Sequence, residues 1–425
     1  MKMVQLKYGK EKMVLEIPDQ NLVGILEANL MDNKQNHETD EQGEIQRALH
    51  QPIGTPRLKE LVKSGQKIVI MVSDVTRPAP SQKMLPPLLE ELAMAGVRDE
   101  DVKVIFGMGI HRRHTEEEKR RLVSDEVYER ITCLDSNEES YIALGNTRRG
   151  TPIYLCQSVV EADVRICTGN IEYHYFAGYS GGAKAILPGA ANYESIRHNH
   201  KLQLDDRAVS GVLEGNPVRE DIDEIGEVLG ITFILNVVLN EKKQVARGFG
   251  GHYLKAHRAG CRYLDSLYSV AIAEPADIVV VSAGGSPKDI NMYQAQKALD
   301  NASQAVKQGG VIILLGECQE GFGEETFEEW IQEAGKPDDL INRLKREFVL
   351  GGHKAAAIAK VVNKAAVIFV TAMPHEDVGR LYFLPCGTAQ QALDQALKQQ
   401  GRNARVLVIP MGGSILPYVS EGTQS

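Results

Sequence analysis

Apolar and polar positions alternate along this chain in a strand–helix rhythm. Short apolar runs that fit buried strands are followed by longer amphipathic segments that fit helices. The apolar runs are residues 67–72, 102–106, 164–168 and 232–239 in the first part of the chain and residues 276–282, 310–315, 365–371 and 406–410 in the second. Apolar strands that alternate with helices are typical of a parallel sheet covered on both faces. The sequence therefore predicts an α/β fold, with mostly parallel sheets and flanking helices.

The length of the chain predicts two domains, because a single hydrophobic core seldom grows beyond about 250–300 residues. The chain has 425 residues. We predict an N-terminal domain at residues 1–262 and a C-terminal domain at residues 270–400, joined by a helix at 253–268. We expect residues 404–425 to return to the N-terminal domain. Ligands of such sheets gather at the carboxyl ends of the strands, and we expect the active site in the cleft between the two domains.

Composition and charge narrow the class of protein. The formal net charge of −9 and the lack of a basic cluster argue against nucleic-acid binding. The N-terminus lacks the apolar core of a signal peptide, and no apolar run approaches the length of a membrane span. The six cysteines form no CxxC pair, which suits a reducing compartment and predicts no zinc site. We therefore expect a cytoplasmic globular protein.

The stretch Ile171–His200 concentrates residues that can do chemistry. Its glycine-rich turn at residues 178–182 would let backbone amides approach an anionic ligand. Lys184 follows the turn, where it could neutralise a phosphate or become a covalent tether. His198 and His200 are two positions apart and do not share a helix face, so we expect only one of them to bind a metal. The alternative is a glycine-rich surface loop with solvent-exposed histidines.

Three predicted strands end in loops that carry reactive side chains. The loops are Ser73–Pro78, Gly107–Arg112 and Thr168–Asn170. Because parallel strands end at the same edge of a sheet, we expect these loops to share one pocket. Each has an ordinary explanation by itself: Asp74 fits a turn residue, Arg77 a surface cation and His111 a partner of a backbone carbonyl. His114, in a charged context, is expected at the surface.

In the second domain, a predicted helix at residues 292–306 carries Tyr293, Gln294 and Lys297. Gln294 and Lys297 are three positions apart, so they share a face and could hold one anion together. The alternative is an exposed helix surface.

These motifs together resemble the nickel-dependent lactate racemase family. The matching segments are SDVTRP at 73–78, GxHR at 109–112, NIEYHYFAGYSGGAKAILPG at 170–189, RHNH at 197–200 and GGSPKDINMYQAQKALDNA at 284–302. They keep their order and span both predicted domains. The resemblance implies a two-domain enzyme whose N-terminal domain binds a nickel-pincer nucleotide, nickel(II) pyridinium-3,5-bisthiocarboxylic acid mononucleotide. Proteins that build this cofactor would then be partners of the chain.

The resemblance also implies a role for each site residue. It implies that Lys184 joins the cofactor through a thioamide and that His200 completes the nickel site, so both belong to the metal centre. His111 and His174 resemble the two acid/base residues. Residues that resemble cofactor contacts are Asp74, Val75, Thr76 and Arg77. Residues predicted on the substrate side are Arg77, Tyr293, Gln294, Lys297 and His353.

The sequence departs from the lactate-specific members of that family at one place. Those members set a tryptophan against the substrate, whereas the only tryptophan here, Trp330, lies in a charged stretch that does not match. The corresponding region is Gly351–Lys354, which predicts a more polar pocket, although His353 equally fits a capping or core residue. Lactate and a larger or more hydroxylated 2-hydroxy acid are therefore comparable candidates for the substrate.

Two other functions compete with a 2-hydroxy acid racemase or epimerase. A nicotinamide-dependent dehydrogenase would share the sheet pattern and the hydride chemistry, but the chain has no GxGxxG motif that opens a helix. A non-catalytic carrier of nickel or nucleotide would not need both His111 and His174. A racemase needs a base on each face of its substrate, and histidine gives and takes protons near neutral pH.

Overall fold

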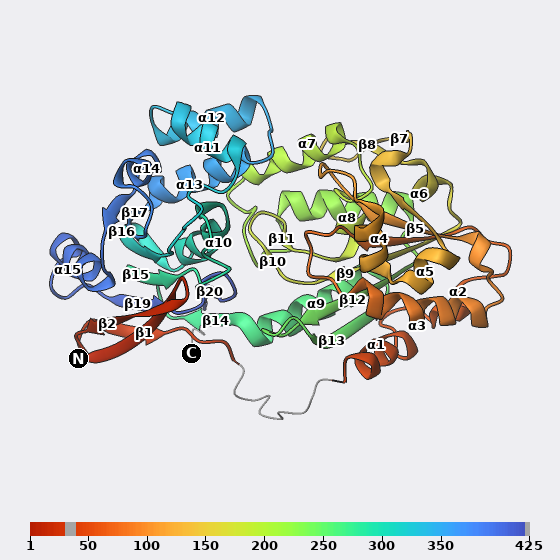
Figure 1. Ribbon diagram of the computed structural model, residues 1–425, viewed down its shortest axis with the longest axis horizontal. Helices are drawn as coiled ribbons and strands as arrows, with labels where there is room; N and C mark the ends of the chain where they lie inside the picture. The colour runs from red at the N-terminus through yellow and green to blue at the C-terminus, as the bar shows by residue number, and fades with distance from the viewer. Residues whose placement is uncertain (30–39, 421–425) are drawn as a thin grey trace. The chain divides into compact units, whose positions relative to one another are not determined.

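The computed structural model describes residues 1–29 and 40–420 of the chain. Two compact units emerge, which we call unit 1 and unit 2 (Figure 1). Unit 1 combines residues 1–32 with residues 266–425, and unit 2 comprises residues 33–265. Unit 2 is thus inserted into unit 1 along the sequence. None of the helices within the described residues is long and apolar enough to cross a membrane.

Unit 2 is built on a six-stranded sheet in the order β13-β12-β9-β4-β5-β6. All neighbours are parallel except β12 and β13, which pair antiparallel. The strands are β4 (Ile68–Ser73), β5 (Val102–Gly107), β6 (Thr132–Asp135), β9 (Val164–Asn170), β12 (Phe233–Leu239) and β13 (Val245–Gly251). Two short antiparallel pairs lie outside it, β7 (Tyr141–Asn146) with β8 (Pro152–Cys156) and β10 (Tyr173–His174) with β11 (Gly178–Tyr179).

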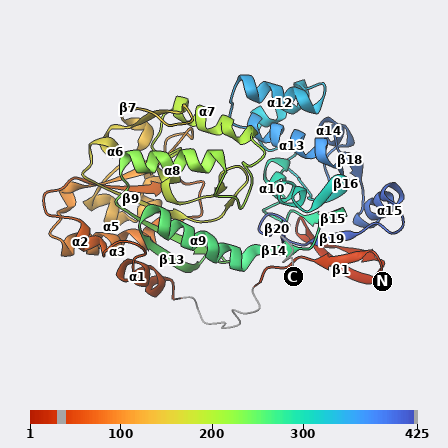
Figure 2. The same ribbon diagram turned by 180° about the vertical axis from the view of Figure 1, so that it is seen from behind.

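Helices cover both faces of this sheet, as the apolar strands require (Figures 1 and 2). Along β4, Ile68 and Ile70 pack into the core with α1 and α3, whereas Val69 and Met71 pack into the core with α7 and α8. Successive side chains of a strand point to opposite faces, so an all-apolar strand fills two cores. The helices of unit 2 are α1 (Glu41–His50), α2 (Leu58–Leu61), α3 (Ser81–Met94), α4 (Glu116–Val123), α5 (Asp125–Arg130), α6 (Gln157–Glu161), α7 (Tyr193–Lys201), α8 (Pro217–Leu229) and α9 (Tyr253–Tyr268).

Unit 1 contains a second six-stranded sheet, entirely parallel, in the order β18-β17-β16-β15-β19-β3. Its strands are β3 (Leu22–Ile25), β15 (Ala276–Ser282), β16 (Val306–Leu315), β17 (Ala366–Val370), β18 (Leu384–Cys386) and β19 (Val406–Ile409). The hairpin of β1 (Lys2–Tyr8) and β2 (Glu11–Ile17) packs on one face together with α15 (Ala389–Gln400). The other helices are α10 (Met292–Ser303), α11 (Glu325–Glu333), α12 (Pro337–Arg346), α13 (Gly352–Lys364) and α14 (His375–Arg380), and β14 (Ser269–Ile272) pairs with β20 (Leu416–Val419).

The two-domain α/β architecture predicted from the sequence is confirmed, with eight predicted sheet strands in place. The division of the chain differs from the predicted one at both ends. The closing strand β19 does not return to the N-terminal sheet, because it pairs with β15 and β3 of unit 1. The opening residues 1–25 join the same unit, since their hairpin and β3 complete its core and its sheet. Residues 421–425 of the predicted returning segment lie outside the described residues.

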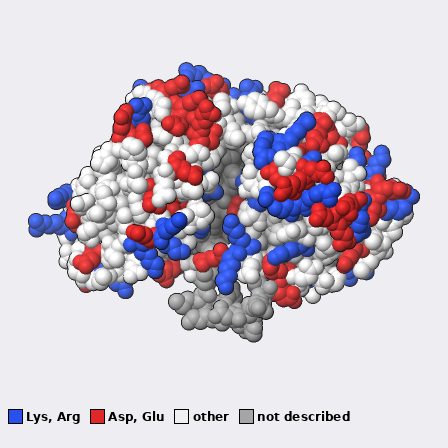
Figure 3. All heavy atoms as spheres, viewed as in Figure 1, with Lys and Arg blue, Asp and Glu red and all other residues white. Residues whose placement is uncertain are grey.

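Acidic and basic side chains are interspersed over the face of the molecule shown in Figure 3. Many of them form exposed ion pairs within a helix, such as Arg120 with Glu116 and Arg130 with Glu126. Pairs of this kind contribute only about 0.3–0.5 kcal/mol each, so they explain solubility better than they explain the fold.

Candidate functional site

The loop after β4 and the loop after β5 lie side by side at one edge of the unit 2 sheet. The two strands end in register, with Ser73 opposite Gly107. This places the buried carboxylate of Asp74 beside the ring of His111, with 3.3 Å between Asp74 Oδ2 and His111 Nδ1. Arg77 Nε lies 3.8 Å from the same carboxylate oxygen. The strand ends therefore bring an acid, an imidazole and a guanidinium together.

Asp74 is held in its ionised form by these neighbours. Burial by itself would raise the pKa of Asp74, but His111, the Thr76 hydroxyl and Arg77 together lower it below its ordinary value. The backbone N–H of Thr76 also donates to Asp74 Oδ1 at 2.7 Å. A carboxylate fixed in this way can orient the His111 ring.

The glycine-rich stretch turns sharply after β9. His174 on β10 pairs with Gly178 on β11, and a short 3₁₀ turn at Gly182–Ala185 carries Lys184. Gly178 has a positive φ of 74°, and a Cβ atom there would lie 2.1 Å from the carbonyl oxygen of Val212. A larger residue at this position would both strain the backbone and collide with it. The tight turn leads the chain from the β10–β11 hairpin into the short 3₁₀ turn that carries Lys184.

Lys184, His174 and Arg77 act on one another electrostatically. Burial, followed by the positive charges of Lys184 and Arg77 and then by His200, lowers the pKa of His174 well below its ordinary value. Burial and the guanidinium groups of Arg77 and Arg219 lower the pKa of Lys184 in the same way. Both shifts favour the neutral forms, which are a basic imidazole at His174 and a nucleophilic amine at Lys184.

The pair His198 and His200 lies on α7, and the two rings have different surroundings. His200 is buried and its ring meets Phe176 edge-to-face at 4.9 Å, whereas His198 is partly exposed. The two histidines thus differ in burial, and which of them binds a metal stays a prediction. His200 is the one that faces the stretch carrying His174.

Helix α8 supports both the glycine-rich stretch and α7, and no local pattern in the sequence predicts these contacts. The fully buried guanidinium of Arg219 donates to the carbonyl oxygens of Ala177 and Tyr179. Two residues later, Asp221 accepts from Asn199 Nδ2 of α7 at 2.9 Å. One helix thus fixes both the segment with Lys184 and the helix with His200.

A second support comes from α9 and β12. His257, buried on α9, lies with Nε2 2.7 Å from the carbonyl oxygen of Ser180. Asn236 on β12 accepts from the N–H of Gly182 at 2.8 Å. Arg258 lies against the other ring nitrogen of His257 at 2.9 Å. These contacts satisfy backbone groups of a turn that has no regular partner strand.

His114 is buried, contrary to the expectation of a surface residue. Its ring lies 2.8 Å from the buried carboxylate of Asp135, at the end of β6, and edge-to-face with Phe106. Of the charged residues around it in sequence, Arg112, Arg113, Glu116 and Glu117 are exposed, whereas Lys119 of α4 is buried beside Asp135 and Glu138. Asp135 and the next residue, Ser136, form a fourth strand-end loop that the sequence did not single out.

Apart from Arg77, which belongs to unit 2, the predicted substrate-side residues lie in unit 1, on α10 and α13. Tyr293 and Gln294 are partly buried and Lys297 is exposed, all on α10. Lys354 on α13 lies 3.8 Å from the centre of the Tyr293 ring and donates to the Tyr293 carbonyl oxygen. Residues at the start of α13 therefore contact the predicted substrate-side helix.

Trp330 lies next to residues 351–354, the segment predicted to stand where lactate-specific members have their tryptophan. It is fully buried on α11, and a Cβ atom on Gly352 would come within 2.3 Å of its indole ring. His353 is buried, accepts from the N–H of Gly351 at 3.1 Å, and has its pKa lowered to about 3 by burial and by Lys354. That contact at the helix start agrees with the capping or core alternative for His353.

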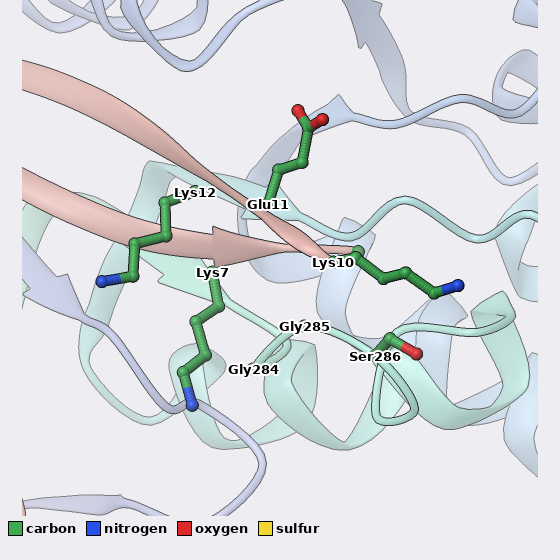
Figure 4. A pocket seen from close by; sticks show the side chains of 8 residues that line it. Lys7, Lys10, Glu11, Lys12, Gly284, Gly285 and Ser286 are labelled. Atoms are coloured by element: carbon green, nitrogen blue, oxygen red, sulfur yellow. The ribbon is translucent and has the colours of Figure 1, made fainter.

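A separate open pocket of about 360 Å³ lies in unit 1 between the β1–β2 turn and the loop after β15. Figure 4 shows that Lys7, Lys10 and Lys12 point in different directions around it. None of the predicted site residues lines it. Within residues 1–29 and 40–420, no cluster of three or more His, Cys, Asp or Glu side chains could hold a metal ion.

Comparison with known proteins gives the family. Residues 8–211 match the lactate racemase N-terminal domain, and residues 271–416 match the lactate racemase C-terminal domain. The chain belongs to the lactate racemase family. Its class is therefore isomerase.

Individual relatives agree over almost the whole chain. The lactate racemase of Thermoanaerobacterium thermosaccharolyticum is 35% identical over 97% of this chain and 98% of its own length. The lactate racemase of Lactiplantibacillus plantarum is 31% identical over 97% of this chain and 99% of its own. The resemblance noted from the sequence motifs is confirmed.

Solved structures agree with the fold of this family member. The lactate racemase apoprotein from T. thermosaccharolyticum matches with a TM-score of 0.87 at 34% identity, over 98% of this chain and all of that one. A protein from Thermotoga maritima matches with a TM-score of 0.61 at 19% identity, over 90% of this chain and 98% of that one. The second match supports the fold alone.

Proposed function

We propose that this lactate racemase family member interconverts the two enantiomers of a 2-hydroxy acid, with lactate as the first candidate. Two relatives over 30% identical along nearly their full length are lactate racemases. The observation that carries the proposal is that Arg77 connects the two imidazoles: its Nε approaches the Asp74 oxygen that lies beside His111, and its charge, with that of Lys184, lowers the pKa of His174.

His111 and His174 are proposed to act as the acid/base pair. Inverting the α-carbon requires proton transfer at the hydroxyl group from either side of the substrate, so two bases are needed. His174 is kept neutral by burial and by neighbouring cations, and is ready to accept the hydroxyl proton. The carboxylate of Asp74 lies 3.3 Å from His111 Nδ1 and can orient that ring. The two rings thus have different charged neighbours, a carboxylate beside His111 and cations around His174.

The residues present fit the nickel-pincer nucleotide that the family implies. Lys184 has a pKa lowered by burial, and a neutral amine is what forms a thioamide with a thiocarboxyl group. His200 would supply an imidazole nitrogen, a ligand that suits nickel. Because the described side chains form no metal cluster of their own, further nickel ligands would have to come from the organic group. When bound, this group would supply a centre that accepts hydride from the α-carbon and returns it.

Cationic side chains are proposed to hold the substrate carboxylate. Arg77 is 41% exposed while its Nε stays near Asp74, so its outer nitrogens can reach a ligand. In unit 1, Gln294 and Lys297 share a face of α10 and are the proposed substrate-side residues, with Tyr293. The polar start of α13, including His353 and Lys354, leaves a larger or more hydroxylated acid as the second candidate substrate.

The test uses protein matured with the proteins that build the cofactor. Chiral chromatography would follow D-lactate, L-lactate and a panel of larger 2-hydroxy acids without added nicotinamide. We expect racemisation of lactate, and loss of at least a hundredfold in rate for His174→Ala with nickel content unchanged, because a positioned general base contributes about 10²–10⁴-fold. A requirement for nicotinamide would support the dehydrogenase alternative. Bound nickel without any turnover would support the carrier.

Covalent attachment has its own measurement. Intact-mass spectrometry of the matured protein should show an added mass that Lys184→Met lacks. Lys201→Met is a matched control, because Lys201 is the last residue of α7 and does not belong to the glycine-rich turn. Equal added mass in the Lys184 variant would remove the proposed tether.

A further inference from the structure

The buried residues behind the Asp74 loop suggest how its position is fixed. We propose that His114, held by Asp135, is a positioning residue that sets the Asp74 loop against His111. The inference rests on the proposed function, because His111 is its proposed acid/base residue. His114 itself touches neither of the two side chains.

The contacts form a continuous line from β6 to the loop after β4. Asp135 accepts from the backbone N–H of His114 through Oδ2 at 2.8 Å, and its Oδ1 lies 2.8 Å from His114 Nδ1. The other ring nitrogen, Nε2, accepts from the backbone N–H of Val75 at 3.0 Å. Val75 follows Asp74 directly in the chain. The ring therefore links a fixed carboxylate to the backbone of the loop.

These bonds also set the tautomer of His114. A nitrogen that accepts from an N–H carries no proton, so the proton of a neutral ring must be on Nδ1, where it donates to Asp135. Both polar atoms of the ring are thereby used, and the side chain is wholly buried. A ring with one orientation and one tautomer can hold the loop in one place.

The same short segment after β6 fixes the loop that carries His111. Asn137 Nδ2 donates to the His111 carbonyl oxygen at 3.2 Å, and Ser136 Oγ accepts from the N–H of Met108 at 3.1 Å. Ser136 Oγ also donates to the carbonyl oxygen of Gly189, at the end of the Lys184 segment. Ser136 and Asn137 thus hold the loop that carries His111. Asp135, at the end of β6, reaches the Asp74 loop through the His114 ring.

The test compares two replacements of His114 with different chemistry. His114→Gln keeps an acceptor near the place of Nε2, whereas His114→Phe keeps an aromatic ring and has no acceptor. Losing one such hydrogen bond costs about 1 kcal/mol or somewhat more, which corresponds to roughly 5–10-fold faster local opening. Amide hydrogen exchange of Val75 in the cofactor-free protein should therefore be roughly 5–10-fold faster in His114→Phe and near wild type in His114→Gln.

Kinetics of the matured enzyme give the second measurement. We expect His114→Phe to lower kcat by roughly tenfold with little change in KM, and His114→Gln to restore most of it. A role in stability alone would change the melting temperature of both variants and leave kcat of the folded enzyme unchanged. His50→Phe is a matched control, since the His50 side chain is 51% exposed.

The outcomes separate the inference from the proposed function. Wild-type exchange at Val75 in His114→Phe, or no rescue of exchange by His114→Gln, would overturn the positioning role. Unchanged kcat in His114→Phe beside an active wild type would also overturn it. If the wild-type enzyme racemises no 2-hydroxy acid, the proposed function fails, while the exchange measurement still decides whether His114 holds the loop.

Discussion

Replacing Arg219 by methionine tests whether α8 holds the glycine-rich stretch in place. Methionine has a similar length and no charge, so the variant removes the hydrogen bonds and keeps most of the packing. Two hydrogen bonds from a charged group, to the carbonyl oxygens of Ala177 and Tyr179, would be lost, although the Ala177 oxygen keeps the bond from the backbone N–H of Tyr179. Hydrogen bonds to a charged group contribute about 1.5–3 kcal/mol each, which gives roughly 3–6 kcal/mol for two.

An opposing term reduces this cost. Arg219 is fully buried, so removing it also removes the penalty of keeping a cation out of water. Its carboxylate partner, Asp223, keeps an ion pair with Arg258 and is not left alone. The loss of the two carbonyl hydrogen bonds outweighs the gain from removing a buried charge. We therefore expect the free energy of unfolding of unit 2 to fall by about 3 kcal/mol.

The assay is thermal unfolding of the cofactor-free protein. For a unit of this size, 1 kcal/mol lowers Tm by about 2–4 °C, so we expect Arg219→Met to melt roughly 6–12 °C below wild type. Arg149→Met is the control. Arg149 forms a partially exposed ion pair with Glu220, which lies on α8 as Arg219 does, and this pair should contribute no more than about 1 kcal/mol. A Tm for Arg219→Met equal to that of the control would refute the reasoning.

Two further predictions concern the Asp74 loop and the Trp330 cluster. Because the pKa of Asp74 is lowered in the folded protein, its stabilisation is present above its unfolded pKa of about 3.9 and is lost as pH falls. The free energy of unfolding of Asp74→Asn should thus be about 1.5–3 kcal/mol below that of the wild type at pH 7. Urea titrations should show this difference between the two proteins shrinking below about pH 4. A difference that stays constant with pH would contradict the reasoning. Gly352→Ala should cost about 1–3 kcal/mol by pressing on Trp330. Fluorescence of this single tryptophan reports the transition, and Gly379→Ala, whose Cβ meets nothing within 4 Å, should match wild type.

The strands and the main site loops could be predicted because their signals are local. The run at residues 278–281 is apolar throughout, and only a strand buried on both faces uses all of those side chains. The loops after β4 and β5 follow from the same rule, since parallel strands end together. Their shared edge, with Asp74 beside His111, was therefore expected before the structure was known.

The missed features depend on contacts between distant segments. The sequence around His114 favours a surface position because five of the next six side chains are charged, yet its own ring turns inward to Asp135, 21 positions away. Arg219 lies in the run REDIDE at 219–224, which looks like a solvated helix face until its carbonyl partners, 40 or more positions earlier, are seen. Pairing of β19 with β3 and β15 also has no local signal, because an apolar strand fits either sheet.

The insertion of unit 2 into unit 1 has a consequence for synthesis on the ribosome. Every residue of unit 2 has been translated once the nascent chain passes residue 265, so this unit can complete its core early. Strand β3 must wait for β19, which is translated about 380 residues later, before it finds its only sheet neighbour. During that interval its backbone N–H and C=O groups have no strand partner, and a chaperone that binds extended apolar segments would meet this part of the newborn chain first.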